Sequence, residues 1–260
     1  MARFAVILPA AGRSTRFGDP KQKKIYADLD GRAVWLRAAD PFLGRVDVAR
    51  VIVAIAPEDR ELFDRRYRAD VAFREIVVVE GGAERSDSIA RALEAVDPSA
   101  DFVAVHDAAR PCLAAELVDA VFAAAIEHGA ALLAVAVADT LKRVDADRRA
   151  VETVPRAGLY GAQTPQVFRR DLLLRAYAGR SRVGAAVTDD AQLVEALGHP
   201  CHVVDGSPMN LKITTAADLR LASAILQALP KPRRDAPAHP FADDRAMWGD
   251  GPKRKLEDLF

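Results

Sequence analysis

Short apolar runs recur along the chain, and between them apolar residues repeat at the spacing of helices. The runs are rich in Val and Ile, and both sets of alternating positions are apolar. They comprise residues 4–8, 51–56, 75–79, 102–106 and 131–138. Because a strand that is apolar on both faces must be covered on both sides, these runs predict a mostly parallel sheet between two layers of helices.

Two of the intervening segments carry clear helical signals. In residues 116–129, apolar side chains gather on one face and Gly129 provides a stop. Residues 214–229 open with Thr215 and Asp218, which have the spacing of a capping box. Strands and helices alternate in this way over most of the chain, which predicts the α/β fold class.

Two regions break the alternation. Residues 139–161 are polar, with a turn signal in their middle and loosely alternating apolar positions, which predicts a projecting β-hairpin arm. Residues 230–260 combine prolines with many charges, a composition that cannot support a packed core. The sequence therefore predicts a domain over residues 1–229 and a flexible tail at 230–260. The alternative is that Trp248 and the terminal LEDLF dock on another surface.

Composition narrows the classes of partner. The 37 Lys and Arg residues balance the 37 Asp and Glu residues, whereas duplex binders carry a basic excess, so no nucleic-acid partner is expected. Cys112 and Cys201 are too few for a disulfide framework, which fits the cytoplasm. No apolar run approaches the ~20 residues of a membrane helix. The short run at 4–8 favours a buried strand over a signal peptide, and no membrane partner is expected.

A cationic loop bearing glycine follows the first apolar run, in the stretch PAAGRSTRFGDPKQK. Ligands of open α/β sheets bind beyond the carboxyl ends of the strands, where this loop would lie. Ala10, Ala11 and Gly12 are small enough to let backbone N–H groups approach an anion, while Arg16 and Lys21 add full charges. Neither a Walker A loop nor a G-x-G-x-x-G pattern is present. The loop is thus either another kind of phosphate site or a surface loop with solvated cations.

Asp107 follows the fourth apolar run, in the stretch HDAARP, and would lie at the same edge of the sheet. A carboxylate that faces a cationic phosphate loop is what a Mg²⁺–triphosphate complex requires. The alternative is that Asp107 caps a helix or pairs with Arg110. The two features together favour the metal interpretation.

Two further stretches have both a functional and a plain interpretation. Gly81 and Gly82 open GGAERSDSIARAL, which could read a base edge through its backbone and Ser88, or could be an ordinary turn before a capped helix. Lys212 lies in the strand-like run NLKIT, where it would either point into the site or protect an edge strand. The five histidines show no close spacing typical of metal ligands.

Taken in order, these motifs resemble one family. PAAG with R-F-G and PKQ, GG-x-ERSDS, HDAARP, DTLKR, TPQ-x-F, TDDA and N-x-K-I-T follow one another as they do in the 2-C-methyl-D-erythritol 4-phosphate cytidylyltransferase family. The resemblance implies a Rossmann-like sheet and a homodimer that exchanges its arms. It also implies an enzyme that joins CTP and 2-C-methyl-D-erythritol 4-phosphate to give 4-diphosphocytidyl-2-C-methyl-D-erythritol and pyrophosphate, with Mg²⁺ or another divalent cation.

The same resemblance assigns roles to residues. Three cations would be catalytic, namely Arg16, Lys21 and Lys212. The nucleotide would be held by Pro9, Ala10, Ala11, Gly12, Gly81, Gly82, Ser88, Asp107 and Ala108. Asp107 would bind the metal. The polyol phosphate would be held by Asp107, Arg110, Thr140, Arg156, Thr164, Thr188 and Lys212, with Thr140 and Arg156 supplied by the arm of the second subunit.

The chain departs from the family pattern in three places. Lys23 and Lys24 stand where an apolar or aromatic pair is usual, the interval between Arg16 and Lys21 is short, and Ala83 replaces an acidic residue. Two other functions remain open. Ribitol 5-phosphate cytidylyltransferases share most of these motifs, so ribitol 5-phosphate or another polyol phosphate is the alternative acceptor. A non-catalytic nucleotide-binding or scaffold protein is the third hypothesis, against which the set of charged site residues argues.

Overall fold

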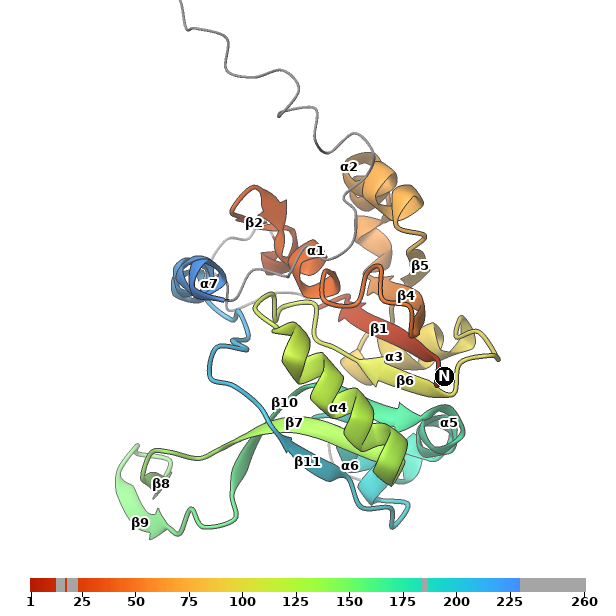
Figure 1. Cartoon of the computed structure of the whole chain (residues 1–260). Helices are drawn as coiled ribbons and strands as arrows, with labels where there is room; N and C mark the ends of the chain where they lie inside the picture. The colour runs from red at the N-terminus through yellow and green to blue at the C-terminus, as the bar shows by residue number, and fades with distance from the viewer. Residues whose placement is uncertain (13–16, 18–22, 184–186, 230–260) are drawn as a thin grey trace, which may run out of the picture. The chain divides into compact units, whose positions relative to one another are not determined.

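A computed structural model gives the fold shown in Figure 1, and it describes residues 1–12, 17, 23–183 and 187–229 of the 260-residue chain. These residues belong to one unit that extends from Met1 to Leu229. Arg16, Lys21 and the predicted tail at 230–260 lie outside the described residues. No helix within the described ranges is long and apolar enough to cross a membrane.

A seven-stranded sheet forms the centre of this unit, with the strand order β11-β7-β10-β6-β1-β4-β5. Its strands are β1 (Phe4–Ala10), β4 (Val48–Ile55), β5 (Val77–Glu80), β6 (Phe102–Val105), β7 (Ala130–Ala136), β10 (Tyr160–Arg169) and β11 (His202–Asp205). Only β10 runs antiparallel to its neighbours, β6 and β7. The remaining pairs are parallel, which confirms the predicted, mostly parallel α/β sheet.

Helices cover both faces of the sheet, as the apolar runs require. On one face lie α1 (Val34–Ala39), α2 (Arg60–Phe73) and α4 (Ala115–His128), and on the other lie α3 (Arg85–Glu94), α5 (Arg170–Ala178) and α6 (Asp190–Glu195). Successive side chains of β1 alternate between these two cores: Phe4 and Val6 pack on the first, Ala5 and Ile7 on the second. Because β1 is buried on both faces of the sheet, it fixes the point from which the following loop begins.

A smaller third cluster supports the edge of the site. Helix α7 (Ala216–Ala228) packs through Ala222 near the short strand β2 (Asp28–Leu29), which pairs with β3 (Arg32–Ala33). The cluster also contains Ile213, which precedes α7 and is fully buried. Thr215 and Asp218 form the predicted capping box at the start of α7. The residues just before α7 are therefore held on one side by the buried Ile213 and on the other by the capping box.

The predicted arm is present as a separate antiparallel hairpin. Strands β8 (Leu141–Val144) and β9 (Ala150–Val154) pair only with each other and project from the sheet at the lower left of Figure 1. Almost all of its side chains are exposed, including Val144 and Val151. The apolar side chains of the arm therefore contribute little to the core of their own chain.

Three local predictions were wrong or incomplete. The arm ends before residues 160–161, because these belong to β10, a strand that the sequence did not predict. Strand β11 was also missed, since it has four residues and lies half exposed at the edge of the sheet. Residues 210–214 form no strand, although NLKIT looks like one. Their backbone is instead held by the loop after β6, through the N–H of Ile213 and the carbonyl of Ala109 at 2.8 Å.

Candidate active site

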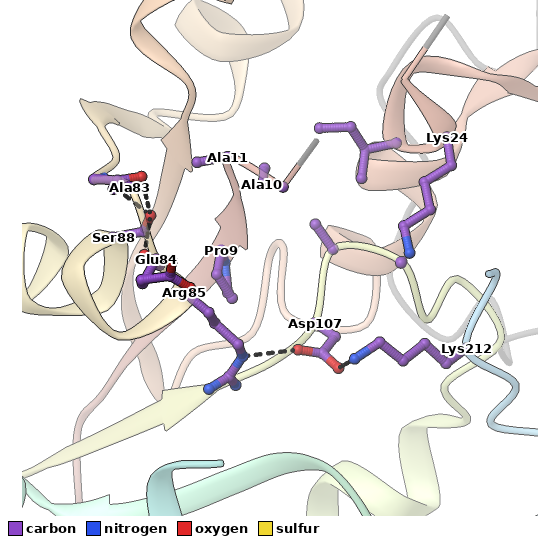
Figure 2. A pocket seen from close by; sticks show the side chains of 15 residues that line it. Pro9, Ala10, Ala11, Lys24, Ala83, Glu84, Arg85, Ser88, Asp107 and Lys212 are labelled. Carbon is purple, nitrogen blue, oxygen red and sulfur yellow. Dashed lines mark hydrogen bonds and ion pairs between the residues drawn. The ribbon is translucent and has the colours of Figure 1, made fainter. Parts of the chain in front are cut away.

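A pocket opens beyond the carboxyl ends of β1, β5 and β6, which is where α/β sheets bind ligands. Figure 2 shows that its walls come from the residues after β1, from the start of α3, from the loop after β6 and from Lys212. Its volume is about 160 Å³. Predicted site residues that line it are Pro9, Ala10, Ala11, Gly12, Gly82, Ser88, Asp107, Ala108 and Lys212.

Asp107 lies at the centre of the charged part of the pocket. The Lys212 ammonium is 2.7 Å from Asp107 Oδ2, and Nε of Arg85 is 3.4 Å from Oδ1 (Figure 2). A third cation, Arg110, has its Nε 3.7 Å from Oδ2. Asp107 is only 7% exposed, and burial by itself raises the pKa of its carboxyl. The three cations outweigh that effect and hold the pKa well below its usual range, so Asp107 is ionised.

The backbone of Asp107 is supported from below by a buried polar chain. Its N–H donates to Thr164 Oγ1 at 3.0 Å, and Thr164 Oγ1 lies 3.1 Å from Nδ1 of His106. The other ring nitrogen of His106 is 3.1 Å from the carbonyl oxygen of Arg110. Because a carbonyl can only accept, Nε2 carries the proton and Nδ1 accepts from the threonine. Burial lowers the pKa of His106 to about 4, so the ring is neutral at pH 7.

Lys212 reaches Asp107 because the segment that carries it is anchored by Asn210. This asparagine is fully buried, and its Nδ2 donates to the carbonyl of Thr164 at 2.9 Å. The backbone carbonyl of Asn210 accepts from Nη1 of Arg110 at 2.7 Å. The prediction that Lys212 lies in a strand is wrong, and with it the edge-strand alternative. Of the two interpretations of Lys212, the structure shows the one that directs it into the site.

The loop after β5 packs closely against the loop after β1. A Cβ on Gly81 would lie 2.6 Å from Ala11 Cβ and 2.7 Å from Ser88 Oγ, so only glycine fits there. Gly82 N–H donates to Ser88 Oγ at 3.0 Å, and that hydroxyl donates to the Glu84 carbonyl at 3.1 Å. Ser88 thus stabilises the turn while it lines the pocket. Gly81 itself does not line this pocket, but borders a neighbouring pocket of about 280 Å³ that is also lined by Ala11.

Lys23, one of the departures from the family pattern, has a clear structural role. Its ammonium is 2.7 Å from Asp59 Oδ2 and 3.0 Å from Glu58 Oε1. The hydroxyl of Tyr26 donates to the same oxygen of Asp59 at 3.0 Å. Lys23 therefore ties the start of the helical turn η1 (Lys24–Tyr26) to the turn η2 (Pro57–Asp59). The neighbouring Lys24 lines the pocket, which the sequence did not predict.

The remaining predicted residues lie elsewhere. Thr164 and Arg110 support Asp107 and do not line the pocket. Thr188 is exposed near the start of α6, where its N–H donates to Gln192 Oε1 at 3.0 Å. Thr140 and Arg156 are exposed on the two sides of the arm and do not line the pocket of their own chain. Their predicted role in substrate binding requires the arm of a second subunit.

Comparison with known proteins identifies the family. The family model of IspD, described as 2-C-methyl-D-erythritol 4-phosphate cytidylyltransferase, matches residues 4–228. The chain belongs to this family. A cytidylyltransferase of that name from Rhodopirellula baltica is 45% identical over 236 residues, covering 86% of this chain and 95% of the relative. One from Frankia casuarinae is 47% identical over 225 residues, covering 86% of this chain and 81% of the relative.

Solved structures agree with this assignment. The 2-C-methyl-D-erythritol 4-phosphate cytidylyltransferase of Thermus thermophilus is 36% identical and superposes with a TM-score of 0.70, covering 87% of this chain and 100% of that one. A 4-diphosphocytidyl-2C-methyl-D-erythritol synthase from Anaerococcus prevotii superposes with a TM-score of 0.74 at 29% identity, covering 87% and 96%. The chain is thus a nucleotidyltransferase, and its mostly parallel α/β fold matches the solved structures of its family.

Arg85 is a site residue that sequence reasoning missed. It is the first residue of α3 and lines the pocket beside Asp107. Nη2 of its guanidinium is 2.8 Å from Asp190 Oδ2, and Asp190 is completely buried. The motif GG-x-ERSDS contains Arg85, but an arginine at the start of a helix is ordinarily solvated. Nothing in the local sequence indicates a buried carboxylate partner that comes 105 positions later.

The residues of the pocket also indicate what kind of metal they could hold. Within the described ranges, no group of three or more His, Cys, Asp or Glu side chains is placed to hold an ion. Mg²⁺ does not need such a cage, because it is usually bound by one or two carboxylates together with substrate phosphates and water. Asp107, a single ionised carboxylate in an open pocket, fits that requirement.

The neutral state of His106 predicts how stability depends on pH. Its pKa is about 4 in the folded protein and about 6.5 when unfolded, so between these values the unfolded chain binds more protons. Stability should therefore fall as pH falls from about 6.5 to 4, by about 3 kcal/mol from this residue. The measurement is urea unfolding at a series of pH values for the wild type and His106→Gln. The variant should show a flatter dependence over this interval, and an unchanged slope would contradict the assignment.

Proposed function

We propose that the pocket around Asp107 joins CTP and 2-C-methyl-D-erythritol 4-phosphate, giving 4-diphosphocytidyl-2-C-methyl-D-erythritol and pyrophosphate. One observation carries the proposal: Lys212 and Arg85 converge on Asp107 beside the small-residue loop after β1, in a chain whose family match spans residues 4–228. Cations around one fixed carboxylate, next to open backbone, suit two phosphate-bearing substrates.

The reaction is an in-line displacement at phosphorus. An oxygen of the polyol phosphate attacks the α-phosphorus of CTP, a new P–O bond forms, and the bond from the α-phosphorus to the bridging oxygen breaks. Pyrophosphate leaves with that electron pair. Since the reactants repel each other and the chemistry needs little covalent help, the protein contributes positioning and electrostatic stabilisation.

The nucleotide lies against the loops after β1 and β5. At Gly12 a Cβ would meet nothing within 4 Å, so the backbone there is open to an approaching phosphate. The aliphatic and glycine residues Ala10, Ala11 and Gly82 form the adjacent wall. The resemblance to the family adds Arg16 and Lys21, outside the described residues, as the cations that stabilise charge on the α-phosphorus.

A divalent cation completes the nucleotide side of the proposal. Asp107 would hold Mg²⁺, which when bound supplies positive charge to the triphosphate. The residues around Asp107 determine where the bound cation would lie in the pocket. The backbone of Asp107 is fixed through Thr164, and Lys212 stands on the side of the pocket opposite Arg85 (Figure 2).

The polyol phosphate approaches from the side of Lys212. The Lys212 ammonium stands at the pocket, and the Lys212 side chain is 41% exposed, so the ammonium can turn toward an anion. Thr140 and Arg156 would reach this substrate from the arm of a second subunit, and Thr188 from the main body. The exposed Val144 and Val151 support this role, because apolar side chains on a projecting hairpin gain stability when a second chain covers them.

Replacement of Lys212 tests the acceptor side. Lys212→Ala should lower kcat/KM by about 10²–10³, the scale of a lost preorganised charge contact. The measurement is pyrophosphate release from CTP and Mg²⁺ with 2-C-methyl-D-erythritol 4-phosphate. Arg65→Ala, which removes an exposed cation of α2, is the control and should retain wild-type activity.

Ribitol 5-phosphate in place of the methylerythritol substrate separates the two acceptors. We expect pyrophosphate release with 2-C-methyl-D-erythritol 4-phosphate and none with ribitol 5-phosphate. Release with ribitol 5-phosphate alone would change the acceptor, and release with neither would contradict the proposed function.

Mixed dimers test the exchanged arm. If Arg156 serves the pocket of the second subunit, a dimer of one Arg156→Ala chain and one Lys212→Ala chain contains one intact pocket. Random mixing in equal amounts should then restore about a quarter of wild-type activity, since half of the dimers are mixed and each has one working site. Each variant alone is the control. A mixture as inactive as the separate variants would contradict the exchanged arm.

A further inference from the structure

Arg85 joins two carboxylates that are far apart in the chain. Its Nη2 is 2.8 Å from Asp190 Oδ2, and its Nε is 3.4 Å from Asp107 Oδ1. The side chain lies along the pocket wall opposite Lys212, as Figure 2 shows. A guanidinium presents its donors in a rigid plane, so one contact fixes the direction of the other. The position of Arg85 on the Asp190 side therefore determines the position of its Nε beside Asp107.

Asp190 is an unusually firm anchor for this arginine. It is completely buried, and its Oδ1 accepts from the hydroxyl of Tyr177. The N–H groups of Asp190 and Ala191 both donate to Gln166 Oε1 at 3.0 Å. Neither the carboxylate nor its backbone can move without breaking buried hydrogen bonds. Within the described residues, Arg85 is the only cation paired with Asp190, and a buried carboxylate without such a partner is costly.

The three cations around Asp107 differ in their freedom to move. Lys212 makes the shortest contact with Asp107, but its side chain is the most exposed of the three and carries its charge at the end of a flexible aliphatic chain. Arg110 is held by the Asn210 carbonyl and has its Nε 3.7 Å from Asp107 Oδ2. Arg85 is held by Asp190 and faces the other oxygen of Asp107. When Lys212 turns toward a substrate phosphate, the Asp107 carboxylate keeps two anchored cations, Arg85 and Arg110, among the residues that the structure describes.

We propose that Arg85 is a positioning residue, which Asp190 anchors and which holds the Asp107 carboxylate in place while Lys212 leaves it for the substrate phosphate. This inference rests on the proposed function. Without Arg85, Oδ1 of Asp107 loses its only cation among the described residues, and Lys212 remains tied to the carboxylate. Turnover then falls and the acceptor binds less well, although Arg85 need not touch either substrate.

A purely structural role makes a different prediction. If Arg85 only neutralises Asp190, its loss should lower stability, and activity should follow stability. The variants Arg85→Gln, Asp190→Asn and their combination separate the two roles. Asn keeps an oxygen for Tyr177, and the double variant has no unpaired buried charge, so its stability should return toward that of the wild type.

The experiment measures thermal unfolding, kcat and the KM of each substrate for the wild type and the three variants. Arg85→Gln should unfold several degrees lower and lose about 10- to 100-fold in kcat, the scale of a misplaced site group. Its KM for the polyol phosphate should rise more than its KM for CTP. In the double variant the unfolding temperature should recover while kcat stays low. Recovery of kcat together with stability would overturn the proposal.

Crystal structures of the wild type and the double variant, without ligands, give a readout that does not need turnover. The Asp107 carboxylate should keep its orientation in the wild type and rotate away from residue 85 in the variant. An unchanged Asp107 in the variant would also overturn the proposal. If the wild type shows no turnover but Asp107 rotates in the variant, the proposed function fails and the positioning of Asp107 by Arg85 stands.

Discussion

The site depends on one constraint: a buried, ionised carboxylate at the end of β6 must be balanced by cations. Burial opposes the charge on Asp107, and Arg85, Lys212 and Arg110 reverse that opposition. Each of these cations is brought from a different segment, by α3, by the stretch before α7 and by the loop after β6 itself. The charge of Asp107 therefore organises the geometry of three segments.

The buried polar groups around this carboxylate extend the same constraint into the core. Thr164 lies beneath the backbone of Asp107, and Asn210 links Thr164 to the segment of Lys212. Gln166, two positions after Thr164 in β10, supports the helix that bears Asp190. Strand β10, which alone in the seven-stranded sheet runs antiparallel to its neighbours, thus carries the supports of both carboxylates on a short stretch. Partly satisfied buried networks are costly, so each of these contacts restricts the others.

The architecture was largely predictable from the sequence, because apolar runs and helical spacing report burial directly. The predicted α/β class, five of the strands and the arm are confirmed. Strand β10 was not predictable in this way, since its first residues continue the polar arm and Pro165 interrupts it. The small pocket residues and Asp107 were predicted by their place after strands. Arg85 and Asn210 were not, because their roles arise from partners distant in sequence. The sequence also could not show that Lys23 pairs with Asp59, which explains one departure from the family pattern.

In the function that we propose, these segments converge around one cytidine nucleotide and its acceptor. The most direct test is a crystal structure of the protein with Mg²⁺, a CTP analogue that resists transfer, and 2-C-methyl-D-erythritol 4-phosphate. The triphosphate should lie between the loop after β1 and Asp107, with the Lys212 ammonium turned from Asp107 toward a phosphate. A nucleotide bound on another surface, with the pocket of Asp107 filled only by water, would contradict the proposed function.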